Sequence, residues 1–70
     1  MADGSYTARV RRGCTELERR GLGSIEEAVR VARRMAQAEA ADELTWVAWE
    51  VVGPDLRVRR RGRVGPWGDA

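Results

Sequence analysis

The 70-residue chain has no histidine and only one cysteine, Cys14. Without histidine it cannot form a Ser-His-Asp or Cys-His nucleophilic site, or a metal site ligated by imidazole. One cysteine can neither close an intrachain disulfide nor supply a multi-thiolate zinc site. Catalysis by carboxylates needs a converging pair in a cleft, whereas the acidic residues of this sequence fall on the outside of an expected helix or on an edge strand. We therefore expect no catalytic residue, no metal ligand and no enzyme activity.

Lysine is absent as well, which excludes a Walker-type phosphate loop. Residues 21–24, Gly-Leu-Gly-Ser, precede a helix as phosphate loops do, but Glu26 stands where a dinucleotide-binding fingerprint has its third glycine. Together with Glu27 it would repel a phosphate at this helix end. The segment is predicted to be a turn and a helix cap, and no cofactor is expected.

Asparagine and phenylalanine are also missing, Ile25 is the only isoleucine, and all thirteen cationic side chains are arginine. Lysine, asparagine, phenylalanine and isoleucine all have AT-rich codons, so their scarcity indicates a high-GC genome, such as that of a high-GC bacterium. Eleven carboxylates reduce the formal net charge to +2, far below the balance of a protein that neutralises many phosphates. The placement of the arginines is therefore more informative than their number.

No apolar run approaches the roughly 20 residues that span a bilayer, and the N-terminus lacks the basic and apolar regions of a secretory signal. A lone cysteine suits a reducing compartment, so we expect a cytoplasmic protein that does not contact membranes. The chain is predicted to form one domain, residues 1–70, which buries only about 60% of its unfolded surface. Because disulfides and metal sites are excluded, a homodimer is the expected way to stabilise so small a core.

Two strands are predicted before the helix. In residues 6–12 the apolar side chains of Tyr6, Ala8 and Val10 alternate with polar ones, which is typical of a half-buried strand. Gly13 marks a turn, and residues 14–20 form a second strand with only one large apolar residue. A strand this rich in charge suits the edge of a sheet, where charge discourages pairing with another chain.

Ser24 begins the best-defined helix of the sequence. Its hydroxyl is placed to accept from the backbone N–H of Glu27, whose side chain can reach back to Ser24. Apolar residues then recur three and four positions apart, which predicts one face packed on a sheet. Because Glu39 returns to that face, we expect the packed part to end near residue 38. The predicted apolar stripe consists of Ile25, Ala28, Val29, Ala32, Met35 and Ala36.

Residues 44–52 and 56–64 are predicted as two further strands around a turn at 53–55. Trp49 is expected beneath the helix, with Leu56 and Val58, while Trp46 is expected on the opposite face. A slip of one residue would exchange the two tryptophans. The segments 1–5 and 65–70 are expected to be irregular. The order predicts a two-layer α+β fold, ββαββ, with a four-stranded, mainly antiparallel sheet and one helix on a single face.

One helix leaves the second sheet face uncovered, and the pattern gathers arginines around a tryptophan on it. Three interpretations remain open: a contact with a second copy or another protein, a solvated face, or a nucleic-acid surface on which guanidinium groups pair with phosphates and indole stacks on bases. Trp67, near the C-terminus, is predicted to fold back over the core, with insertion into a partner as the alternative. The candidate contact residues are Arg9, Arg11, Trp46, Arg57, Arg59, Arg61, Arg63 and Trp67.

The sequence thus favours a small non-catalytic binding or accessory domain that acts through protein–protein contacts of its open sheet face, as a homodimer or with another protein. Nucleic-acid binding by the same face is the alternative. The strand order and the identity of a partner do not follow from the sequence.

Overall fold

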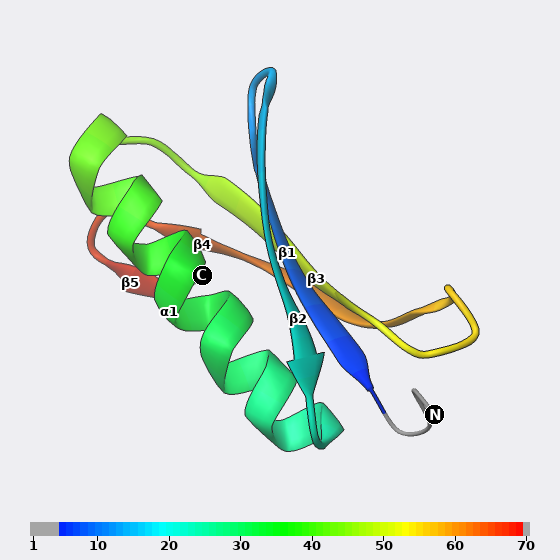
Figure 1. The fold of residues 1–70 in the computed structure, drawn as a ribbon. Coiled ribbons are helices and arrows are strands. Elements are labelled where there is room, and N and C mark those ends of the chain that lie inside the picture. The colour runs from blue at the N-terminus through cyan, green and yellow to red at the C-terminus, as the bar shows by residue number, and fades with distance from the viewer. Residues whose placement is uncertain (1–4, 70) are drawn as a thin grey trace.

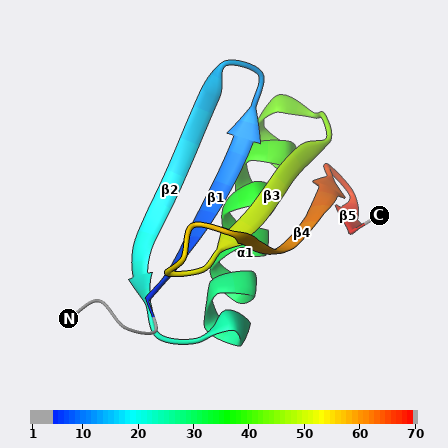
Figure 2. The ribbon, with the colours of Figure 1, turned by 90° about the vertical axis from the view of Figure 1, so that its right-hand side faces the viewer.

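A computed structural model describes residues 5–69 of the chain. One helix lies against one face of a single sheet, as the two views in Figures 1 and 2 show. The five strands are all antiparallel to their neighbours, in the order β2-β1-β3-β4-β5. The elements are β1 (Tyr6–Arg12), β2 (Thr15–Leu22), α1 (Ile25–Glu43), β3 (Val47–Val52), β4 (Val58–Gly65) and β5 (Gly68–Asp69).

The expected ββαββ order and two-layer α+β fold are confirmed. The prediction that residues 65–70 are irregular is wrong, because Gly65 ends β4 and a two-residue turn leads into the short strand β5. The irregular segment expected at residues 1–5 lies outside the described residues, apart from Ser5, which precedes β1 without strand structure.

The hairpin of β1 and β2 forms the edge of the sheet, as expected. Gly13 turns the chain with a φ of 59°, a left-handed conformation that glycine adopts without strain. Near the other end the pairing shifts by one residue, so that Ala8 faces Arg19 but Tyr6 faces Leu22. This bulge contains Gly21, whose φ is 77°. It lengthens β2 beyond the predicted residue 20 and places Leu22 in the core.

The N-terminus of α1 is capped by side chains. The Oγ of Ser24 accepts a hydrogen bond from the backbone N–H of Glu27 at 3.1 Å, as predicted. The carboxylate of Glu27 accepts from the backbone N–H of Gly23, also at 3.1 Å, rather than from Ser24. The return half of the predicted capping box is therefore shifted by one residue, from Ser24 to Gly23.

A stripe of four alanines brings α1 close to the sheet. Ala28, Ala32, Ala36 and Ala40 are fully buried, and Ala40 shows that the prediction of packing only to residue 38 is wrong. Glu39 does not end the packed part of the helix, because Arg12 of β1 neutralises its carboxylate. The guanidinium Nε lies 3.1 Å from Glu39 Oε1, and Nη1 lies 2.6 Å from Glu43 Oε2. The last two turns of the helix are thereby held against β1.

The sheet side of the core consists of valines and one indole. Val10, Val47, Val51 and Val64 are its largest fully buried side chains. Trp49 packs partly buried against both halves of this core, which confirms that it faces the helix. The core is thus shallow, since small alanines meet medium-sized valines.

The turn between β3 and β4 differs from the sequence prediction. Leu56, expected beneath the helix, lies in the turn with a φ of 68° and is 85% exposed. Its backbone N–H donates to the carbonyl of Gly53 at 2.9 Å. The pairing then shifts between Val51 and Val52, so Val58 lies opposite Val52, stays half-exposed and does not join the core beneath the helix. Alternation alone could not reveal a turn this long or the bulge after it.

Leu44 gives a first test of local strain. It ends the helix with a φ of 56° and is 74% exposed, so its side chain contributes little packing while its Cβ disfavours this conformation. We expect Leu44→Gly to raise the free energy of unfolding by about 0.5–1 kcal/mol, measured by urea denaturation. The matched control is Ala41→Gly on the exposed side of the same helix, which is expected to lower it by about 1 kcal/mol. Equal losses in both variants would contradict the cap geometry.

Gly62 gives a test of the fit around Trp49. A Cβ at Gly62 would lie 2.8 Å from Cζ2 of the indole, which is too close for any contact between carbon atoms. Gly62→Ala is therefore expected to lower the free energy of unfolding by about 1–3 kcal/mol and to change the near-ultraviolet dichroism of the tryptophans. At Gly23, where a Cβ would meet its nearest neighbour at 3.5 Å, the same substitution is the control and should cost much less.

Candidate functional site: the open face of the sheet

The face of the sheet that the helix leaves open carries charges in two rows across the strands. The register places alternating residues of each strand on this face, opposite the buried Ala8, Val10 and Val51. We call these rows the first and the second charge row. The first runs Glu18, Arg9, Glu50 and Arg61 over β2, β1, β3 and β4, and the second runs Glu16, Arg11, Ala48 and Arg63.

Arg9 is the centre of the first charge row. Its Nε lies 2.9 Å from Oε2 of Glu50, and its guanidinium also lies 3.8 Å from Glu18 and 3.5 Å from Glu16. The Nε–H makes no hydrogen bond, so the shortest contact is an ion pair that is not aligned for one. Arg9 and Glu50 are both largely buried by their neighbours. Two carboxylates of β2 and one of β3 therefore hold this guanidinium in place.

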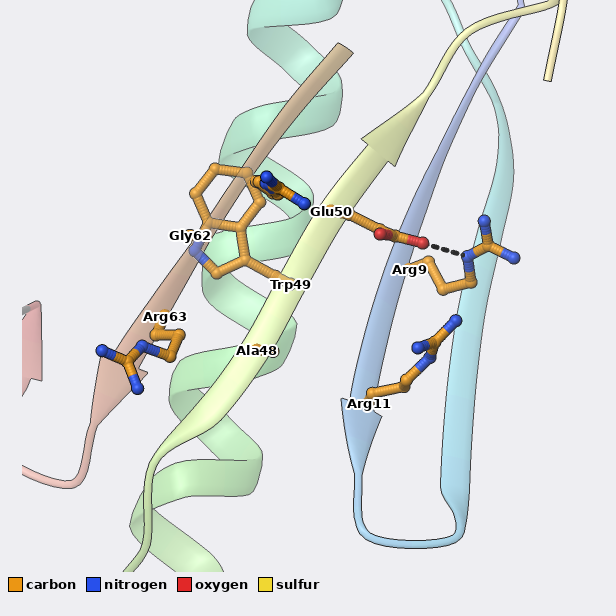
Figure 3. Close-up of a pocket in the computed structure, with 8 residues that line it drawn as sticks. Arg9, Arg11, Ala48, Trp49, Glu50, Gly62 and Arg63 are labelled. Atoms are coloured by element: carbon orange, nitrogen blue, oxygen red, sulfur yellow. Dashed lines mark ion pairs between the residues drawn. The ribbon is translucent and has the colours of Figure 1, made fainter. Parts of the chain in front are cut away.

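The second charge row is interrupted by a small residue. Arg11 lies 3.7 Å from Glu16, but its other neighbour in the row is Ala48, whose methyl group cannot fill the space between two arginines. A hollow of about 380 Å³ results, seen from the open side in Figure 3. It is lined by Arg9, Arg11, Ala48, Trp49, Glu50, Arg61, Gly62 and Arg63.

Trp46 lies at the end of this face beside the second charge row. It is 51% exposed, and its ring lies against Gly65, where a Cβ would come within 3.1 Å. The guanidinium carbon of Arg63 is 5.8 Å from the centre of the ring, a cation–π contact. Gln37 of the helix holds this end of β4 by donating to the carbonyl of Gly65 at 3.0 Å. Trp46 therefore takes the position predicted for it, and Arg63 covers part of it.

The arginines of β4 differ from those of β1 in their pairing. Within the part of the chain that the structure describes, neither Arg61 nor Arg63 forms an ion pair, whereas Arg9 and Arg11 do. One side of the face thus holds cations that are already neutralised, and the other side holds cations that are available to a partner.

Two predicted members, Arg57 and Arg59, are not part of this cluster. Arg57 lies in the turn before β4, and Arg59 lies at the bulge, 3.0 Å from the carboxylate of Asp55. Asp55 also accepts from the backbone N–H of Arg57 at 3.1 Å. This backbone hydrogen bond, together with the charge of Arg59, lowers the pKa of Asp55 below its ordinary value of 3.8. Both arginines therefore serve the turn, and only Arg9, Arg11, Trp46, Arg61 and Arg63 lie together on the face.

The prediction that Trp67 covers the core is wrong. It lies in the turn between β4 and β5 and is 89% exposed, the most exposed large apolar side chain of the described residues. The core end near it is closed by Val64 and by the alanines of the helix, so an indole is not needed there.

Sequence reasoning missed the acidic half of the site. Glu16 and Glu18 were assigned to a protective edge strand, but they lie directly opposite Arg11 and Arg9. The signal was present, because a tight turn at Gly13 fixes the register of the hairpin and pairs acidic with basic residues on one face.

Among residues 5–69 no cluster of three or more histidine, cysteine, aspartate or glutamate side chains could hold a metal ion. The single helix in this part of the chain is not long and apolar enough to cross a membrane. No protein family matches the sequence, and neither a curated protein nor a solved structure matches the chain. The geometry of the open face is therefore the basis for a functional proposal.

The Arg9–Glu50 pair can be tested by a double-mutant cycle. Both side chains are largely buried, so screening by water is reduced, and we expect a coupling free energy of about 0.5–1 kcal/mol between Arg9→Gln and Glu50→Gln in urea denaturation at low protein concentration. The exposed pair of Arg20 and Glu18 is the control, with an expected coupling within about 0.3 kcal/mol of zero. Equal coupling in the two cycles would contradict a special position for Arg9.

Proposed function

We propose that the chain is a non-catalytic cytoplasmic binding module whose open sheet face contacts another protein. The observation that carries the proposal is the arrangement of the two charge rows, in which acidic and basic residues alternate around a hollow above Ala48. Such a face can recognise a partner by placing an opposite charge over each of its own.

The unpaired cations of β4 are the available half of this surface. Arg61 and Arg63 have no acidic partner among the described residues, and Trp46 beside them is half-exposed. Arginine and tryptophan are enriched at the energetically important positions of protein interfaces. A carboxylate from a partner would neutralise Arg61 or Arg63, while an apolar side chain would cover the indole.

Nucleic-acid binding is the second candidate, supported by the proximity of Trp46 and Arg63, which could combine base stacking with a phosphate contact. The charge rows favour a protein instead. Glu16, Glu18 and Glu50 lie among the four arginines of the rows, and each would repel a phosphate backbone.

The two candidates are separated by charge reversal at one position. Arg61→Glu replaces an unpaired cation on the open face, and Arg60→Glu makes the same change one residue away, opposite the core residue Val51 and so on the other face. We expect Arg61→Glu to abolish capture of protein partners, including a differently tagged copy of the chain, by the immobilised protein. Arg60→Glu should capture them as the unaltered protein does.

The nucleic-acid arm is a titration of a labelled oligonucleotide at about 50 and about 200 mM salt. A protein-binding face predicts no binding that falls steeply with salt. Binding that weakens at least about tenfold over this range, and further in Arg61→Glu but not in Arg60→Glu, would establish the second candidate and overturn the first.

A further inference from the structure

We propose that the open face binds a second copy of this chain, related by a two-fold axis that runs parallel to the strands between β1 and β3. The inference rests on the proposed function and names the partner. Its support is that the two charge rows become complementary to themselves over all four strands under this rotation, whereas a two-fold axis across the strands brings like charges together.

The first charge row shows how this works. An axis along the strands reverses the order of the row in the facing copy, because β2 then lies over the partner's β4 and β1 over the partner's β3. Glu18 meets the partner's Arg61, and Arg9 meets the partner's Glu50. Each of the four positions therefore faces an opposite charge.

The second charge row fits in the same way. Glu16 meets the partner's Arg63, which has no acidic partner within its own chain among the described residues. Arg11 meets the partner's Ala48, so its side chain enters the hollow of about 380 Å³ instead of another charged side chain. Arg11 is thus the one charged residue of the two rows that meets no charged side chain of the partner, and the hollow above Ala48 gives its side chain room.

Two-fold axes across the strands bring like charges of the same face together. An axis across the strands leaves every residue over its own strand in the partner. When the axis follows one row, Glu18 faces the partner's Glu18 and Arg9 the partner's Arg9. When it runs between the rows, Glu18 faces the partner's Glu16, and Arg61 faces the partner's Arg63. Like charges in contact cost binding free energy, so these arrangements are disfavoured.

The surroundings of the rows agree with the proposed axis. Trp46 continues the open side of β3 beyond Ala48, and the rotation places it over the turn of the partner's first hairpin. That turn contains Gly13, which has no side chain to obstruct an indole. The exposed half of Trp46 is thereby given a position to be covered.

A charge swap between residues 16 and 63 tests this arrangement. Glu16→Arg and Arg63→Glu each place two like-charged pairs in the dimer, and each is expected to raise the dimer Kd, measured by sedimentation equilibrium, by roughly tenfold or more. The double variant restores opposite charges across the interface and should return the Kd to within about threefold of the unaltered protein. Arg60→Glu, on the other face of β4, is the control and should leave the Kd unchanged.

The single cysteine supplies an independent measurement of the axis. Cys14 is exposed in the turn of the first hairpin, so a nitroxide can be attached without any substitution. With strands about 4.8 Å apart and facing sheets about 10 Å apart, the proposed axis places the two labels about 15 Å from each other. An axis across the strands would separate them by about 30 Å. Dipolar broadening at the shorter distance is the expected result.

The outcomes separate this inference from the function on which it rests. A mass of one chain at several hundred micromolar overturns the second copy as partner, while loss of another protein's capture by Arg61→Glu would still support the protein-binding face. A dimer whose Kd is unchanged in both Glu16→Arg and Arg63→Glu overturns the inference, and the proposed protein-binding face is overturned only if Arg61→Glu also captures protein partners as the unaltered protein does. A double variant no tighter than the single variants overturns the axis.

Discussion

The structure depends on one constraint, which is that a single 19-residue helix must cover a sheet wider than itself. Four alanines let the helix approach closely, and its contacts reach β1, β3 and β4. Among the described residues, the resulting core contains no fully buried side chain larger than valine. Since buried apolar area is the main source of stability in a domain of this size, so shallow a core leaves little reserve. The ion pairs of Arg12 with the end of the helix and the charge rows on the other face both compensate for this.

The charge rows occupy the face of the sheet that the helix leaves uncovered. An apolar face would aggregate, and a face of arginines alone would repel itself. Arg9 solves this locally, because a planar guanidinium can contact several carboxylates at once while its stem covers the backbone beneath it. A lysine ammonium would match such a geometry poorly. The arginine bias of the sequence therefore has a structural use on this face.

The parts of the fold that depend on local chemistry could be predicted from the sequence. Alternation placed Ala8 and Val10 in the core, and Ser24 fixed the start of the helix. The errors occurred where two distant elements meet. Arg12 forms an ion pair with Glu39, so Glu39 can lie on the packed side of the helix. Leu56 adopts a left-handed conformation, so the turn before β4 is longer than the alternation of side chains predicted. The same holds for the site. The alternation within each strand was enough to predict which arginines lie on the open face, but only the register between strands shows that Glu16, Glu18 and Glu50 lie beside them.

The edges of the sheet disfavour strand addition, which leaves the open face as the surface for association. At one edge, β2 is interrupted by the bulge at Gly21 and carries Glu16 and Glu18, which oppose pairing with another charged strand. At the other edge, the two-residue β5 covers only the end of β4 at Val64 and Gly65, and the part of β4 before it carries Arg59, Arg60, Arg61 and Arg63, whose like charges discourage pairing with another copy of this strand. Both edges are thus poor templates for a further strand. Within the part of the chain that the structure describes, the face between them has two arginines without an acidic partner and a hollow at Ala48, which is why we propose it as the surface that a second copy covers.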